Sequence, residues 1–281
     1  MSEETVLVVG LGEVGRPLFE LLKESEKSVV YGFDVDRSKM QSLKQATPPD
    51  KVDIIHVCLP CSSRTEFVEI TTGYIKKFKP KLAIINSTVP PGTTTKIREQ
   101  CKDCLVAHSP VRGVHKNTEH MKWELKRWTK YVGGANARAA DATRIHFEKL
   151  GLKTKVLKGC TETELAKLFE TTYRAWMIAC FQEMHRISRR FEANFADVVD
   201  FIEDTHRVRS DRPVMFPDVI GGHCLIPNIK LLQGDYDSKM LCLILDSNER
   251  RKEEVKDRVV MEEVERTKRK VEEHRKQVDR A

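Results

Sequence analysis

The sequence predicts an α/β fold with a doubly wound parallel sheet, followed by an all-helical region and a charged helical tail. In the first half, short apolar runs alternate with amphipathic stretches, and a glycine-rich turn follows the first run. After Gly159 this alternation stops and long helical patterns take over. Alternating strands and helices place a parallel sheet between two layers of helices. We therefore expect a Rossmann-like dinucleotide-binding domain over residues 1–158, a helical central domain over 159–245 and a charged helical tail over 246–281.

Seven short apolar runs are expected to form the strands. They span residues 5–9, 28–33, 53–59, 82–86, 104–108, 130–134 and 153–157. Between most of them lie amphipathic stretches such as "GRPLFELLKES" and "ARAADATRIHFEKLG", which have the apolar spacing of surface helices.

The second half is expected to be helical. Residues from Thr161 to about Arg190 contain no Gly or Pro and open with "TETE", which is typical of a capping box. Two further helices are expected at 194–206 and 227–234. The tail is rich in i,i+4 acid–base pairs. Three valines, Val264, Val271 and Val278, stand one heptad apart, but the second apolar heptad position is missing in most turns. This pattern favours a solvated helix and leaves a coiled coil open.

Charge and composition limit the classes of partner. Of the net charge of +7, the tail contributes only +1, from 12 Lys/Arg and 11 Asp/Glu. No Lys/Arg block is interleaved with aromatic residues, so an anionic small-molecule substrate is favoured over nucleic acid. No apolar run approaches the roughly 18 residues of a membrane span, and the N-terminus lacks the basic segment of a signal peptide. With no secretory signal, the eight cysteines are expected to be reduced thiols in the cytoplasm.

The first turn has the spacing of a dinucleotide-binding site. Gly10, Gly12 and Gly15 follow the G-x-G-x-x-G pattern between a strand and a helix. Asp34 ends the second strand nineteen residues after Gly15, where a carboxylate can accept both ribose hydroxyls and would repel a 2′-phosphate. We therefore expect NAD, while the nearby guanidinium of Arg37 leaves NADP open. The alternative is that the glycines only form a turn. The expected site also includes Glu13, Val14, Leu59, Pro60, Ser87 and Thr88.

Three further segments resemble one family. They are "INSTVPPGTTTKI" (85–97), "TELAKLFETTYRAWMIACFQEMHRIS" (163–188) and "VIGGHCLIPN" (219–228). Together they resemble the UDP-glucose/GDP-mannose dehydrogenase family, and the "GGHC" form is closest to its UDP-N-acetylmannosamine type. The resemblance covers about residues 5–255. It implies two hydride transfers from a primary alcohol to NAD, through a cysteine-bound thiohemiacetal and thioester, and a homodimer formed through the long helix.

The resemblance assigns roles to three catalytic residues. Cys224 matches the nucleophile, and the N-terminus of the following helix can lower the pKa of its thiol; the alternative is a buried, inert cysteine. Lys167 matches the lysine that stabilises the oxyanion; the alternative is a surface lysine on an amphipathic helix. Thr88 matches a threonine that binds water beside the reacting carbon; the alternative is a helix-capping hydroxyl.

The chain also departs from the family pattern. Thr171 replaces an asparagine, Asn228 replaces a catalytic aspartate, and Val111 replaces a glutamate, so thioester hydrolysis lacks its expected general base. Only the charged tail follows "LDSNERR", which in the family leads into a nucleotide-binding domain. Three alternatives remain open. A two-electron dehydrogenase could act on a smaller hydroxy compound, a partner could complete the substrate site, or the protein could be an NAD-binding scaffold or sensor without turnover.

Two Cys-x-x-Cys pairs have the spacing of zinc ligands. The pair Cys58 and Cys61 follows a strand, whereas Cys101 and Cys104 precede one. In a parallel sheet these positions lie at opposite edges, so no metal site is expected.

Overall fold

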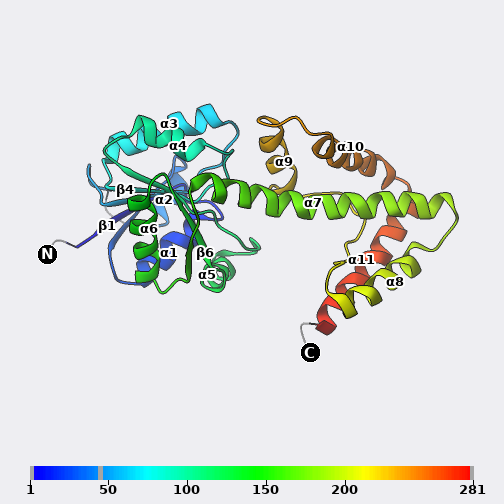
Figure 1. Ribbon diagram of the computed structural model, residues 1–281. Coiled ribbons are helices and arrows are strands. Elements are labelled where there is room, and N and C mark those ends of the chain that lie inside the picture. The colour runs from blue at the N-terminus through cyan, green and yellow to red at the C-terminus, as the bar shows by residue number, and fades with distance from the viewer. Residues whose placement is uncertain (1–2, 44–46, 279–281) are drawn as a thin grey trace. The chain divides into compact units, whose positions relative to one another are not determined.

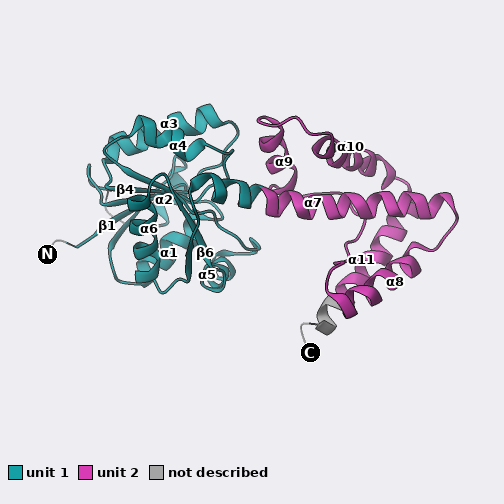
Figure 2. Cartoon of the chain, viewed as in Figure 1, with its two compact units in different colours: residues 1–168 teal, residues 169–281 magenta. Residues whose placement is uncertain are grey.

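The structure is a computed structural model that describes residues 3–43 and 47–278, with side chains as far as Glu273. The chain divides into two compact units, residues 1–168 and residues 169–281 (Figure 2). The boundary lies at Leu168, inside the long helix, ten residues beyond the predicted end of the first domain.

The first unit contains a seven-stranded sheet in the order β2-β1-β3-β4-β5-β6-β7. Its strands are β1 (Thr5–Val9), β2 (Val29–Phe33), β3 (Ile54–Val57), β4 (Leu82–Ile85), β5 (Leu105–His108), β6 (Lys130–Gly134) and β7 (Thr154–Val156). The parallel arrangement is confirmed for β1 to β5. For the last two strands it is wrong, because β6 runs antiparallel to β5, and β7 is parallel to β6. The alternation of strands and helices does not show in which direction each strand runs. The helix between β5 and β6, α5 (Thr118–Arg127), packs beside α1 (Gly15–Glu24).

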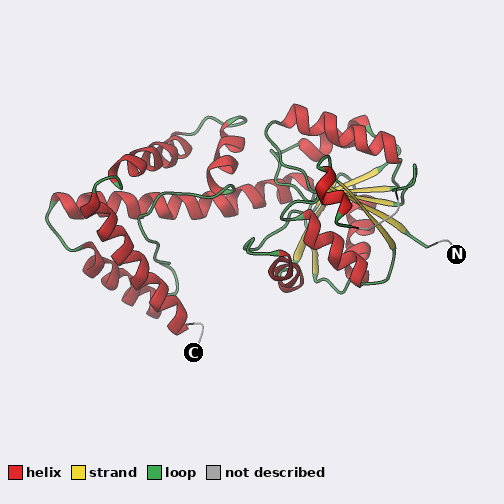
Figure 3. Cartoon of the chain, turned by 180° about the vertical axis from the view of Figure 1, so that it is seen from behind, coloured by secondary structure: helices red, strands yellow, loops and turns green. Residues whose placement is uncertain are grey.

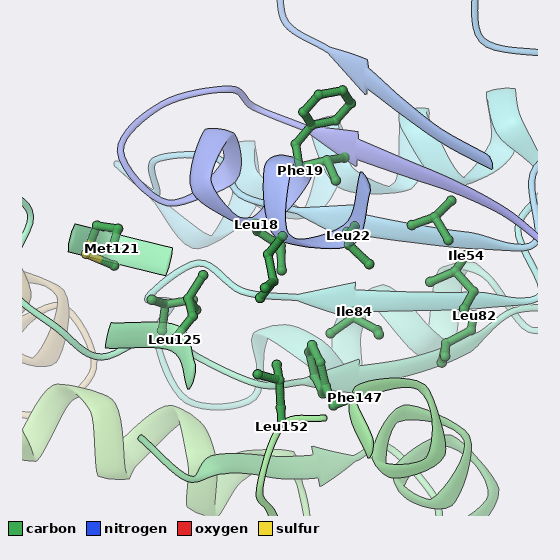
Figure 4. Packing of buried hydrophobic residues seen from close by; sticks show 14 of the residues in the cluster. Leu18, Phe19, Leu22, Ile54, Leu82, Ile84, Met121, Leu125, Phe147 and Leu152 are labelled. Atoms are coloured by element: carbon green, nitrogen blue, oxygen red, sulfur yellow. The ribbon is translucent and has the colours of Figure 1, made fainter. Parts of the chain in front are cut away.

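Helices cover both faces of this sheet (Figures 1 and 3). Besides α1 and α5 they are α2 (Arg37–Gln41), α3 (Arg64–Phe78), α4 (Thr93–Gln100) and α6 (Ala137–Lys149). Alternate residues of β1 enter two separate cores. Val6 and Val8 pack with side chains of α1, α5 and α6, several of which Figure 4 labels, whereas Leu7 and Val9 pack with those of α3 and α4. This period of two buries both faces and produces the doubly wound architecture.

The long helix α7 (Cys160–Arg190) begins in the first unit and continues into the second. The second unit adds α8 (Phe195–Arg209), α9 (Leu225–Gln233), α10 (Lys239–Glu254) and α11 (Arg258–Val278). Its core contains Phe181 of α7, Val199 of α8 and Val271 of α11. None of the helices in the described part of the chain is long and apolar enough to cross a membrane.

The tail differs from the solvated helix that the sequence favours. Asp246, its predicted start, lies inside α10. On α11, Val264 and Val271 are each only 2% exposed, and this helix packs against α8. The heptad spacing therefore marks a face that packs within the chain. Val278 lies outside the residues whose side chains are described.

Candidate active site

The turn between β1 and α1 has the geometry of a dinucleotide-binding loop. Gly10 has a φ of +86°, and a Cβ placed on it would lie 2.5 Å from the carbonyl oxygen of Cys58. A Cβ on Gly15 would lie 1.7 Å from the carbonyl oxygen of Gly10. These two glycines are therefore required by the packing of the protein itself. A Cβ on Gly12 would meet no atom within 4 Å, so the packing of the protein does not require glycine at this exposed position.

The start of α1 is suited to a phosphate. Val14 occupies the N-cap, and no side chain caps the helix. The amide groups at a helix N-terminus attract anions, as in other dinucleotide-binding turns. Glu13, the remaining loop residue, is exposed.

Asp34 fixes the glycine loop to the end of β2. Its Oδ2 accepts a hydrogen bond from the backbone N–H of Leu11 at 2.7 Å, and its Oδ1 accepts one from Asp36 N–H at 2.9 Å. Each carboxylate oxygen retains a further lone pair, so the group can still accept ribose hydroxyls. The cation beside it is Lys39, whose Nζ lies 3.5 Å from Oδ2. The sequence analysis names only Arg37 as a cation near Asp34, and this residue is exposed at the start of α2.

The end of β3 lies next to this loop, and the end of β4 lies next to that of β3. Asn86 N–H donates to the carbonyl of Val57 at 2.8 Å, and Ser87 follows it directly. Since β1 lies between β2 and β3 in the sheet, the chain leaves it in opposite directions, and ligands bind at such a switch point. Leu59 and Thr88 are half-buried, Ser87 is buried and Pro60 is exposed. Thr88 does not cap the helix that follows, because the N-cap of α4 is Gly92.

The first turns of α7 are fixed to the sheet by Glu164, a contact that the sequence did not reveal. Its carboxylate is fully buried and accepts hydrogen bonds from Gly92 N–H at 2.6 Å and from both the N–H and the hydroxyl of Thr94, at 2.8 and 2.6 Å. The predicted capping box is wrong, because Glu164 caps α4 instead of its own helix, and Thr161 already lies inside α7.

Lys167 lies one turn after Glu164 and is half-buried. Its charge contributes to lowering the pKa of His108 and that of Lys130, so it lies near the ends of β5 and the start of β6. The structure therefore places the proposed oxyanion lysine among buried polar groups of the first unit, in contrast to a fully solvated surface lysine.

His108 and Lys130 are two buried polar residues that the sequence analysis did not identify. Burial lowers the pKa of His108 to about 3. Its Nε2 lies 3.0 Å from the carbonyl of Ser87, which can only accept, so Nε2 carries the proton and Nδ1 accepts from Thr163 at 2.8 Å. Burial also lowers the pKa of Lys130 to about 7, and its Nζ donates to Ser109 O at 2.8 Å. Both residues lie in apolar strands, which gave no signal of a polar role.

Cys224 occupies the N-cap of α9 in the second unit. Its thiol is exposed, in contrast to the buried, inert cysteine that is the alternative. Of the preceding glycine pair, Gly222 has a φ of +78°, a value that favours glycine, whereas Gly221 does not. An exposed thiol at a helix N-terminus has the surroundings of a reactive cysteine.

Two of the departures from the family pattern contact each other. Nδ2 of Asn228 donates to Oγ1 of Thr171 at 3.1 Å, and both side chains are buried. Val111, the third departure, is 5% exposed and packs in the core shared by α1 and α5.

The Cys-x-x-Cys pairs are separated as the topology suggested. Cys58 follows β3, whereas Cys101 and Cys104 precede β5 in the hydrophobic core. Burial raises the pKa of Cys58 and that of Cys104 to about 12, which keeps both thiols protonated.

Comparison with known proteins identifies relatives of both units. Residues 161–250 match the central domain of the UDP-glucose/GDP-mannose dehydrogenase family. The UDP-N-acetyl-D-mannosamine dehydrogenase of Methanocaldococcus jannaschii is 25% identical over 259 residues, covering 78% of this chain and 59% of the relative. That of Methanococcus aeolicus is 23% identical over 262 residues, covering 78% and 58%. The chain thus spans less than two thirds of the length of these relatives.

Solved structures show the same fold. The UDP-D-ManNAc dehydrogenase of Pyrococcus horikoshii has a TM-score of 0.72 at 23% identity, covering 88% of this chain and 68% of that one. The 3-hydroxyisobutyrate dehydrogenase of Mycobacterium tuberculosis has a TM-score of 0.67 at 17% identity, covering 91% and 95%. The resemblance is thereby confirmed: the chain is similar to UDP-N-acetyl-D-mannosamine dehydrogenases, and its residues 161–250 match the central domain of the UDP-glucose/GDP-mannose dehydrogenase family.

Proposed function

We propose that the chain is an NAD-dependent dehydrogenase that oxidises a primary alcohol of an anionic small molecule, of the nucleotide-sugar type, through Cys224. The observation that carries this proposal is the exposed thiol at the N-cap of α9, in a chain whose first turn has the geometry of a dinucleotide-binding loop. The names of the relatives support the substrate class.

The residues that would hold NAD come from the ends of four adjacent strands. The loop from Gly10 to Gly15 would receive the pyrophosphate, Asp34 the ribose hydroxyls, and Leu59, Pro60, Ser87 and Thr88 the remainder. When bound, NAD accepts the hydride. A Gly12→Ala variant tests this assignment, because its new methyl group meets no protein atom and leaves folding unchanged. We expect NAD affinity, measured by calorimetry, to fall at least tenfold; unchanged affinity would contradict the proposal.

The proposed reaction proceeds in two oxidations. Loss of a hydride and of the hydroxyl proton converts the alcohol to an aldehyde. The Cys224 thiolate adds to its carbon, and the resulting oxyanion is stabilised by the Lys167 ammonium and protonated to a thiohemiacetal. Loss of a second hydride and of this proton forms a thioester. Water positioned by Thr88 attacks it, the C–S bond breaks, and the products are a carboxylate and the thiol group of Cys224.

A specific contact favours a second candidate, a two-electron dehydrogenase. In the proposed hydrolysis a base must take a proton from water, but the buried Asn228 and Thr171 bring together an amide and a hydroxyl, neither of which is a base at neutral pH. Without a base the thioester would accumulate on Cys224 and turnover would stop, so continuous turnover would require release of the carbonyl compound after the first oxidation. In this second candidate reaction, oxidation stops at the carbonyl compound.

The number of NADH formed per substrate distinguishes these reactions. UDP- and GDP-sugars are incubated with NAD, and the wild type is compared with Cys224→Ala and with Cys242→Ala, a control thiol in the same unit. Two NADH per substrate, lost only in Cys224→Ala, support the four-electron reaction, whereas one supports the two-electron reaction. No reduction with any sugar, together with Cys224 unreactive to iodoacetamide, would favour an NAD-binding scaffold or sensor.

A homodimer through α7 remains part of the proposal. Large apolar side chains are exposed along this helix in the second unit, where Phe169 is 55%, Tyr173 60% and Ile187 51% exposed. Tyr173 follows Phe169 by four residues and Ile187 follows Tyr173 by fourteen, spacings that place all three on one helix face. Light scattering should give the mass of two chains for the wild type and of one chain for Tyr173→Glu; a monomeric wild type would refute this part.

A further inference from the structure

A stack of alternating aromatic and cationic side chains lies on the first unit, at α5, β6 and β7. Arg127 lies over the rings of Trp123 and Trp128, at 4.8 and 5.4 Å from their centroids. Arg112 lies over Trp128 and Tyr131, at 4.9 and 5.0 Å. Lys155 of β7 continues the series, 5.9 Å from the Tyr131 ring. We call these six side chains the cation–π stack.

The positive charge of the protein is concentrated in the same part of the chain. Residues 101–168 hold 14 Lys/Arg and 7 Asp/Glu, a net charge of +7, which equals the net charge of all 281 residues. Lys153 and Lys158, which flank β7, are exposed and add positive charge beside the cation–π stack. The local field therefore favours an anionic partner.

The geometry of the stack selects how an anion can bind. Aromatic rings lie beside the guanidinium groups of Arg112 and Arg127, so an oxyanion would bind to the N–H groups that the rings leave open, where carboxylates form paired hydrogen bonds. Arg112 is further oriented by donating from Nη2 to Thr129 O at 2.9 Å. The bases of a nucleic acid would stack on the faces of aromatic rings. Because guanidinium groups already lie over the Trp128 ring, this arrangement favours a carboxylate over a nucleic acid.

Beside the stack, β7 forms an edge of the sheet. β7 pairs with β6 through hydrogen bonds that include Lys130 N–H to Lys153 O at 2.7 Å and Leu157 N–H to Val132 O at 2.8 Å. In a parallel ladder this alternation turns the backbone groups of Thr154 and Val156 towards the other side. Within the described residues no strand pairs there. Such an edge can accept an extended peptide as an additional strand.

We propose that the cation–π stack and the edge of β7 bind an extended acidic segment of a protein partner. The segment would pair with Thr154 and Val156 through its backbone, while its carboxylates bind Lys155 and Arg112. All of these residues belong to the first unit, and none of them takes part in the proposed catalytic reaction.

The stack contains its own fluorescent probe. The chain has three tryptophans, of which Trp123 and Trp128 belong to the stack, so a Trp176→Phe variant confines the emission to it. The full-length variant is titrated with a capped peptide of alternating Glu and Thr. A second peptide of equal charge, in which proline replaces every threonine, cannot pair as a strand.

We expect saturable quenching by the Glu–Thr peptide that weakens with added salt, and at least tenfold weaker binding of the proline peptide. Arg112→Gln and the surface variant Lys155→Gln should each weaken binding at least threefold. Arg138→Gln, an exposed arginine on α6, should leave it unchanged. Equal binding of both peptides, tighter binding of single-stranded oligothymidine, or binding of neither peptide would each overturn the proposal.

Discussion

Replacement of Glu164 tests whether the start of α7 is fixed to the sheet by the N-terminus of α4. The carboxylate is 0% exposed and accepts three hydrogen bonds of 2.6 to 2.8 Å. A hydrogen bond to a charged group contributes about 1.5–3 kcal/mol, and an orphaned buried donor costs about 1–3 kcal/mol. Burial of the carboxylate, which raises its pKa, offsets part of this gain.

We therefore expect Glu164→Ala to lower the free energy of unfolding by about 3–5 kcal/mol, the range for removing one partner from a buried charged contact. Glu164→Gln retains one accepting oxygen but turns an amide donor towards the N–H groups, so about 2 kcal/mol is expected. Urea denaturation followed by circular dichroism measures both values.

The matched control is Glu162→Gln, which removes an exposed carboxylate from the same helical turn and should change stability by less than about 0.5 kcal/mol. If Glu164→Ala were as stable as this control, the three hydrogen bonds would contribute nothing to the fold, and the placement of Lys167 would have to be reconsidered.

Three other predictions concern buried groups. Burial lowers the pKa of His146 to about 4, so the unfolded chain binds a proton below pH 6.5 that the folded chain does not, and stability falls as the pH drops towards 4. His146→Gln should reduce the slope of unfolding free energy in this window by about 1.4 kcal/mol per pH unit. For Lys130, with a pKa of about 7, stability should rise from pH 7 towards 10, and Lys130→Met should abolish that rise; an unchanged slope would contradict the burial of its amine. If hydrolysis of the thioester lacks only a base, Asn228→Asp should convert a single burst of two NADH per Cys224 into continuous NADH formation, and an unchanged single burst would exclude that explanation.

The sheet could be predicted closely because its strands are buried on both faces. The predicted strands agree with the observed ones to within about two residues, since short runs such as Thr5–Val9 contain almost only apolar side chains. Strand direction could not be predicted, because a helix between two strands can return the chain along either course. The sequence shows the one-heptad spacing of Val264 and Val271, which are both buried, but single valines at this spacing do not show which helix packs against α11.

The candidate site was predictable only where a local pattern carries the chemistry. Glycine spacing located the turn at Gly10, and the acidic end of β2 located Asp34. Lys39, which pairs with that carboxylate, is the third residue of α2 and belongs to no recognisable sequence motif. The cation–π stack was missed for a related reason. Arg112 and Lys155 are 43 residues apart in the sequence, and they meet at Tyr131 because the last two strands lie side by side at the sheet edge.

The contact between Thr171 and Asn228 changes how two departures from the family pattern are understood. In the sequence they are separate losses, 57 residues apart, whereas in the structure the amide of one donates to the hydroxyl of the other. Both side chains are buried, and each provides the other with a hydrogen-bond partner. The two departures therefore meet at one place, where an amide and a hydroxyl stand instead of a proton acceptor. Since Cys224 is exposed at its helix N-terminus, apart from this buried pair, covalent capture of a carbonyl and hydrolysis of a thioester would depend on different residues in the proposed reaction.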